Sequence, residues 1–210
     1  MLGIKPDPIH LQIAESCLKE LEDLDPNSFH VHFLRGLIRY KQTRIEDAVS
    51  DLEKVLEFDP NNRECLLYLG ILYILAGRAA KAEVLLTRLV EIDPLTAVNQ
   101  IMPGYAKVAQ GDIAAGVPYY QKALAMEPQN PMLMLMMGVT PGRVLPVEEV
   151  SPILEQLEPL VPYSIFGRVG RFMRLALEGK KEEAKEAGAN EILQQEARWD
   201  EHAAWWMASN

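Results

Sequence analysis

Apolar residues recur along the chain at the three- and four-residue spacing of an amphipathic helix. Residues 63–76 and 79–92 both follow this pattern, and a short break at Gly77 separates them. Pro94 then ends the second stretch, because proline cannot continue the hydrogen-bond ladder of a helix. The pattern therefore predicts pairs of helices joined by short turns.

The helix pairs repeat with a period of 34 residues, and four columns of equivalent positions share this register. The proline column is Pro26, Pro60, Pro94, Pro128 and Pro162, and the glycine column is Gly36, Gly70, Gly104 and Gly138. The small apolar column is Ala14, Ala48, Ala82, Gly116, Val150 and Ala184, and the large apolar column is Leu18, Leu52, Leu86, Tyr120 and Leu154. We expect the small residues to let two helices approach closely and the large ones to fill the space between adjacent pairs.

Residues 63–96 resemble the tetratricopeptide repeat, a helix–turn–helix unit with the same period. The matching positions are Leu66, Leu69, Gly70, Tyr73, Gly77, Ala82, Leu86, Leu89 and Pro94. The resemblance covers nearly the whole chain and implies an all-α fold, a right-handed superhelical solenoid of stacked helix pairs. It says little about function, because the motif residues are packing residues. Within the pattern, Gly77 and Gly111 suit the left-handed residue that ends a helix.

The register predicts a single solenoid over residues 1–210. Its parts are a half repeat at 1–28, repeats at 29–62, 63–96, 97–130 and 131–164, a degenerate repeat at 165–198 and the start of a further repeat at 199–210. Solenoid ends need polar capping helices, yet the last residues include Trp205 and Trp206. We therefore expect the chain to be a fragment of a longer protein.

Two prolines interrupt expected first helices of the pairs, Pro103 and Pro141. A proline inside a helix removes one hydrogen bond and costs about 3 kcal/mol unless the helix bends or ends there. We therefore predict distorted or shortened helices at 97–110 and 131–140.

The composition narrows the class of partner. The formal net charge of −9 disfavours nucleic acid and anionic membrane surfaces. The only two cysteines, Cys17 and Cys65, form neither a disulfide framework nor a zinc motif. No apolar run is long enough for a membrane-spanning helix, and the N-terminus does not have the pattern of a signal peptide. These features predict a cytoplasmic protein.

The chain shows no motif for catalysis or cofactor binding. Its glycines form no GxGxxG after a strand, and no Walker-type lysine is present. His30 and His32 lie two residues apart, whereas two metal ligands on one helix need three- or four-residue spacing. We predict a protein that is not an enzyme and has no cofactor and no metal site.

The first helices carry an apolar stripe beside the packing columns, about 100° round the helix from them. Its members are Phe33, Leu37, Tyr40, Leu67, Ile71, Ile74, Ile101, Tyr105, Val108, Leu135 and Val139. In tetratricopeptide repeats this face lines the concave side of the solenoid. The stripe predicts a non-catalytic scaffold whose apolar groove binds a protein or peptide partner, as an apolar or amphipathic helix. The alternative is that the solenoid itself, or an absent part of the parent protein, covers the stripe.

The neighbouring positions on this face argue against one known mode of recognition. Relatives that clamp a terminal carboxylate would place lysine, asparagine and arginine there. This chain has His30, Glu64, Val98 and Met132 instead. A carboxylate clamp on this face is therefore not expected.

Two other functions stay open. Residues 197–208 resemble part of the repeat regions attached to bacterial serine/threonine kinases and cyclases, which suggests a regulatory or sensor region of a larger signalling enzyme. Self-association through the C-terminal end, at Trp205 and Trp206, is a further hypothesis.

Overall fold

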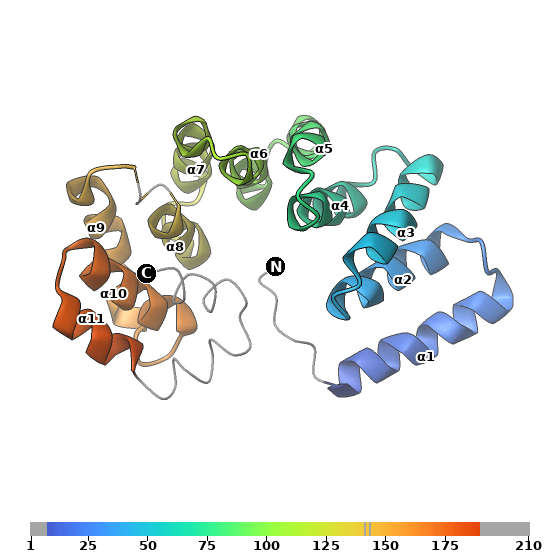
Figure 1. The fold of residues 1–210 in the computed structure, drawn as a ribbon, viewed down its shortest axis with the longest axis horizontal. Coiled ribbons are helices and arrows are strands. Elements are labelled where there is room, and N and C mark those ends of the chain that lie inside the picture. The colour runs from blue at the N-terminus through green and yellow to red at the C-terminus, as the bar shows by residue number, and fades with distance from the viewer. Residues whose placement is uncertain (1–7, 141, 143, 190–210) are drawn as a thin grey trace. The chain divides into compact units, whose positions relative to one another are not determined.

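The computed structural model describes residues 8–140, 142 and 144–189. Within these residues the chain is helical and has no β-strand, which confirms the predicted all-α class (Figure 1). The helices are α1 (Pro8–Leu24), α2 (Phe29–Lys41), α3 (Ile45–Phe58), α4 (Arg63–Leu75), α5 (Ala79–Ile92), α6 (Ala97–Ala109), α7 (Ile113–Met126), α8 (Pro131–Val139), α9 (Val147–Glu155), the 3-10 helix η2 (Glu158–Leu160), α10 (Ile165–Leu177) and α11 (Lys181–Gly188). The segment predicted to start a further repeat, 199–210, lies outside the described residues.

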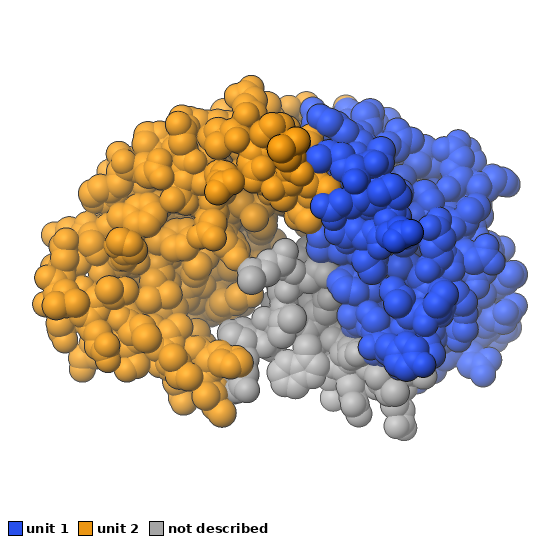
Figure 2. Space-filling view, turned by 180° about the vertical axis from the view of Figure 1, so that it is seen from behind, with its two compact units in different colours: residues 1–5, 113–210 blue, residues 6–112 orange. Residues whose placement is uncertain are grey.

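The chain divides between Asp112 and Ile113 into two compact units, coloured separately in Figure 2. Unit 2 contains α1 to α6, and unit 1 contains α7 to α11. In unit 2, α2 packs against α3 and α4 packs against α5, while α3 packs on α4 and α5 on α6. In unit 1, α8 packs against α7, α9 and α10, and α10 packs against α9 and α11. Each helix therefore contacts chiefly its neighbours along the sequence, as in other repeat proteins.

Polar caps begin the first helices at the repeat interval. The side chains of Ser28, Asn62, Asn130 and Ser164 accept hydrogen bonds from backbone N–H groups in the first turns of α2, α4, α8 and α10. These N–H groups have no partner inside the helix, so the caps satisfy donors that would otherwise be lost. Each cap lies two residues after a proline of the proline column, and this proline stands in the connection that precedes the helix.

The glycine column lies where two helices of a pair approach most closely. A Cβ atom on Gly36 would lie 2.8 Å from Leu52, and one on Gly70 only 2.5 Å from Leu86. A Cβ atom on Gly138 would lie 2.9 Å from Leu154. The expectation that small residues allow close helix packing is confirmed at these positions.

In three helix pairs a glycine in the left-handed conformation ends the first helix. A fourth pair has a left-handed residue of another type at the equivalent position. Gly77, Gly111 and Gly179 have φ of 72°, 89° and 74°, which confirms the expectation for the first two. The equivalent residue of the first complete pair is Thr43, with φ of 61°. A β-branched side chain is strained in this region, so this turn is less favourable than its glycine counterparts.

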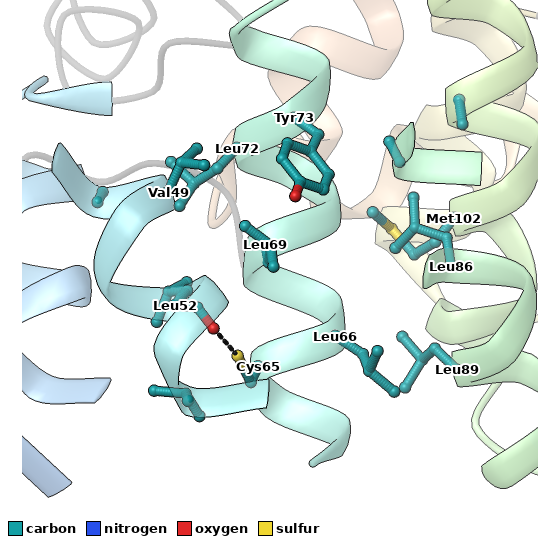
Figure 3. Packing of buried hydrophobic residues seen from close by; sticks show 14 residues of the cluster. Val49, Leu52, Cys65, Leu66, Leu69, Leu72, Tyr73, Leu86, Leu89 and Met102 are labelled. Atoms are coloured by element: carbon teal, nitrogen blue, oxygen red, sulfur yellow. Dashed lines mark hydrogen bonds between the residues drawn. The ribbon is translucent and has the colours of Figure 1, made fainter. Parts of the chain in front are cut away.

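The core of unit 2 lies between the helix pairs (Figure 3). Leu52, Leu66, Leu69 and Leu86 are fully buried there. Cys65 is also buried, and its thiol donates to the backbone carbonyl of Leu52 at 3.2 Å. Desolvation raises the pKa of this thiol to about 12, so Cys65 behaves as a packing residue.

The two helices with unexpected prolines differ in outcome. Helix α8 ends at Val139, two residues before Pro141, and spans 9 residues against 13 in α4, so its predicted shortening is confirmed. Helix α6 spans 13 residues with Pro103 inside it, so of the two predicted outcomes, a distorted or a shortened helix, shortening does not occur there. Pro103 and its neighbours Ile101 and Met102 are buried, and burial of this apolar surface offsets the loss of one hydrogen bond.

Candidate partner-binding face

The predicted apolar stripe continues over three successive first helices of unit 2. Each helix contributes three residues at i, i+4 and i+7, a spacing that places them on one face. They are Phe33, Leu37 and Tyr40 on α2, Leu67, Ile71 and Ile74 on α4, and Ile101, Tyr105 and Val108 on α6. We call these nine residues the apolar row.

The apolar row lies at the boundary between the core and the surface. Eight of its side chains are half-buried, and Ile101 alone is buried, with 2 % of its surface exposed. Phe33, Ile71 and Tyr105 pack against the core of unit 2 on one side. Half-burial leaves part of each apolar side chain at the surface of unit 2.

Aromatic rings beside the row join α2 to α4 through Phe33. The rings of Phe29 and Phe33 stack with centroids 6.1 Å apart, and Phe33 meets Tyr68 edge to face at 6.5 Å. Such contacts hold large apolar surfaces in defined positions. These contacts therefore hold the ring of Phe33, one of the three aromatic residues of the row.

The surroundings of the row are poorly solvated. Desolvation raises the pKa of both Tyr68 and Tyr105, because burial disfavours the charged phenolate. Of the positions that flank the row, His30 and Glu64 are exposed at the start of their helices, and Val98 is half-buried. This face therefore presents apolar surface with charges at its edge, namely Glu64 and the ammonium group of Lys41, which lies 5.2 Å from the centre of the Tyr40 ring.

The remaining two stripe residues, Leu135 and Val139, lie on α8 in unit 1. Both are half-buried and pack against the core of that unit. The methionine-rich sequence of α8 is divided between two roles, since Met134 and Met137 are buried in unit 1. Met132 is half-buried, so part of its side chain stays at the surface of unit 1.

A buried polar cluster in unit 2 was missed by reasoning from the sequence. The carboxylate of Asp51 on α3 accepts from Nη2 of Arg35 at 2.9 Å and from Nη1 of Arg39 at 2.6 Å. Arg35 also pairs with Glu22 of α1 at 3.1 Å, so the cluster connects three helices. The hydrogen bond to Asp51 raises the pKa of Arg35 further above its ordinary value. One signal was present in the sequence: Asp51 is an acid in a column that otherwise holds Cys17, Leu85, Tyr119, Ile153 and Ala187.

His32 belongs to this cluster. Its Nδ1 lies 2.9 Å from Nη2 of Arg35 and 3.4 Å from Asp51. In the described part of the chain, no group of three or more His, Cys, Asp or Glu side chains could hold a metal ion. None of the helices described there is long and apolar enough to cross a bilayer.

The helix pairs, their 34-residue register and the close-packed glycines define a helical repeat protein of the solenoid class. Three family models described as tetratricopeptide repeat match residues 10–63, 39–102 and 102–130. The chain belongs to the tetratricopeptide repeat superfamily.

Curated relatives share the repeat over part of their length. Tetratricopeptide repeat protein 7B of Homo sapiens is 27 % identical over 120 residues, which is 56 % of this chain and 14 % of the relative. Tetratricopeptide repeat protein 7A of Homo sapiens is 27 % identical over 126 residues, again 14 % of its length. The chain thus spans about one seventh of the length of these relatives.

Solved structures share the fold. The type IV pilus biogenesis factor PilW superposes with a TM-score of 0.70 at 16 % identity, covering 94 % of this chain and 90 % of PilW. YrrB, a TPR protein with an unusual peptide-binding site, superposes with a TM-score of 0.58 at 12 % identity, covering 86 % of this chain and 97 % of YrrB. At these identities the likeness concerns the fold.

Proposed function

We propose that this chain is a protein-interaction scaffold whose apolar row binds an apolar segment of a partner, in the form of an amphipathic helix. One observation carries the proposal. Eight side chains of the row are half-buried over three successive first helices, α2, α4 and α6, so they present a continuous apolar face.

An amphipathic helix suits this face for a geometric reason. Its apolar side chains recur at i, i+3, i+4 and i+7 and can insert between the rows of side chains on neighbouring helices. Each Å² of apolar surface removed from water contributes roughly 25 cal/mol, so Phe33, Ile71 and Tyr105 can each add to the affinity. Polar and charged side chains are expected to contribute less to the affinity, since His30 and Glu64 lie at the edge of the face.

The fold comparison is consistent with such a role. YrrB has the same repeat architecture and a peptide-binding site. In this chain the fully buried core positions of unit 2, such as Leu66 and Leu86, differ from the row, most of whose side chains pack against that core on one side.

The test compares the chain with two variants in affinity capture from a lysate of the source organism. The double variant I71D/Y105D places charges in the row. The control V84D places one on α5, where Val84 is 69 % exposed outside the row. Circular dichroism first establishes that all three proteins are equally helical.

We expect a partner that binds the unmodified chain and V84D and is lost with I71D/Y105D. A synthetic peptide covering the partner's apolar helix should then compete for binding. If the double variant retains the same proteins as the control, the apolar row is a structural feature and the proposal is wrong.

A further inference from the structure

Part of the polar cluster of unit 2 recurs in unit 1 after four periods of 34 residues. Glu158 of η2 and Arg171 of α10 occupy the positions of Glu22 and Arg35. They form the equivalent ion pair, since Arg171 donates to a carboxylate oxygen of Glu158, as Arg35 does to Glu22. The two clusters therefore share the register of this ion pair, although Arg35 donates through Nη1 and Arg171 through Nε and Nη2.

The buried acid of the cluster has no counterpart in unit 1. In unit 2, Asp51 accepts hydrogen bonds from Arg35 and Arg39. The residue at the equivalent position of unit 1 is Ala187 on α11. Ala187 instead lines a cavity of about 450 Å³ between η2, α10 and α11. The small side chain leaves space where the other cluster has a carboxylate.

This cavity is lined by three arginines of α10, namely Arg168, Arg171 and Arg174. Arg174 is largely buried, and its Nε has no hydrogen-bond partner, although its terminal nitrogens reach Glu158 at 3.4 Å and Glu178 at 3.3 Å. A buried donor without a partner is unfavourable, because it has lost its hydrogen bonds to water. The cavity thus brings three guanidinium groups together, whereas the Nε of Arg174 is enclosed within the protein.

The acids of α11 do not take the place of Asp51. Glu183 and Glu186 also line the cavity, but both are exposed. Glu183 corresponds to Asp47, which in unit 2 is present together with Asp51. In unit 2 the acid at this position is present in addition to the buried carboxylate of Asp51. Glu183 is therefore not a substitute for Asp51 in unit 1.

We propose that the cavity between η2, α10 and α11 binds a carboxylate group, which takes the place that Asp51 fills in unit 2. Guanidinium groups match a carboxylate in charge and in the geometry of paired N–H donors. The carboxylate comes from an acidic side chain or chain terminus of a partner, or from the acidic residues of 190–210. This site is separate from the apolar row and does not depend on the function proposed for it.

The first experiment restores the missing acid. The A187D variant is compared with the isosteric A187N control by thermal unfolding at pH 7. We expect A187D to unfold about 4 °C above A187N, because a charge-assisted hydrogen bond inside a chain of this size shifts Tm by several degrees. Equal melting temperatures would overturn the proposal.

The second experiment supplies the carboxylate from solution and uses the full chain. Arginine Nε–Hε signals are followed by NMR during titration with succinate, with succinamide plus matching sodium chloride as the control. We expect succinate, and not succinamide, to shift the signals of Arg168, Arg171 and Arg174, and A187D to abolish the shift.

A full-length variant distinguishes the two sources of the carboxylate. It carries E191Q, E196Q, D200N and E201Q, which remove the acids of the last residues. Equal succinate binding by this variant and the unmodified chain supports a site that is open to a partner. Binding by the variant alone supports occupation by the chain's own acids. Absence of binding to both proteins overturns the proposal.

Discussion

The carboxylate of Asp51 lies 2.6 Å from Nη1 of Arg39, and the Asp51 side chain is only 3 % exposed. Arg35 donates to the same carboxylate, so one buried acid faces two guanidinium groups. The contacts join α2 to α3 at a place where other pairs have apolar side chains, such as Leu85. An isolated charge could not be buried here, because its desolvation would cost several kcal/mol.

We predict that D51N destabilises the protein by about 3 kcal/mol, because it leaves two partly buried guanidinium groups without their acid. The matched control is D47N, which removes a carboxylate that is half exposed and pairs with Arg44. An exposed pair of this kind contributes at most about 1 kcal/mol. Urea unfolding followed by circular dichroism at pH 7 measures both; similar losses for the two variants would contradict the structural role given to Asp51.

The turn at Thr43 offers a stabilising substitution. Its φ of 61° costs a residue with a Cβ atom roughly 1–2 kcal/mol, and glycine occupies the equivalent positions Gly77 and Gly111. After the added entropy of the unfolded chain is subtracted, T43G should raise the unfolding free energy by about 0.5–1 kcal/mol. The reverse change, G77T, should lower it by about 1–2 kcal/mol, and thermal unfolding compares the two. A T43G variant less stable than the parent would show that the turn is not strained.

The close approach of Gly70 to Leu86 predicts a cost for the smallest possible side chain. Alanine is favoured over glycine inside a helix by about 1 kcal/mol, but its Cβ atom would lie 2.5 Å from Cδ2 and 2.7 Å from Cγ of the buried Leu86. Overpacking should outweigh the gain, so that G70A destabilises by about 1–2 kcal/mol. The same substitution in an L86A background should stabilise, because the clash is absent. A double-mutant cycle without coupling would contradict this account.

Glu178 predicts a dependence of stability on acid pH. Hydrogen bonds from Lys180 and then Ser151 lower its pKa to about 2 from an ordinary value of 4.5. Because the folded-state pKa is the lower one, the carboxylate stabilises the fold above pH 4.5, and this contribution is lost as the pH falls from about 4.5 to 2. The E178Q variant should therefore lose less unfolding free energy between pH 5 and pH 3 than the parent. E182Q, whose side chain is 85 % exposed, serves as the control and should follow the parent.

The repeat register could be predicted from the sequence because it is a matter of local chain geometry. Proline cannot continue a helix, and glycine tolerates both a left-handed turn and a close helix contact, so Pro94, Gly77 and Gly70 mark their places wherever the chain lies. The spacing of such residues along the sequence therefore gives the length of the repeat. The case of Pro103 shows the limit: a local penalty predicted a distorted or shortened helix at 97–110, while burial of the surrounding apolar surface keeps α6 at 13 residues.

By itself, the sequence determined the all-α class, the helix pairs and the residues that carry the apolar stripe, since helical spacing assigns each residue to a face of its helix. Only the tertiary structure decided which of these side chains are buried: Ile101 belongs to the interior, whereas Ile71 and Tyr105 stay half-buried. It also decided that Asp51 meets Arg35 and that Ala187 lines a cavity. Partners on separate helices are brought together by packing, and helical periodicity carries no information about the distance between them.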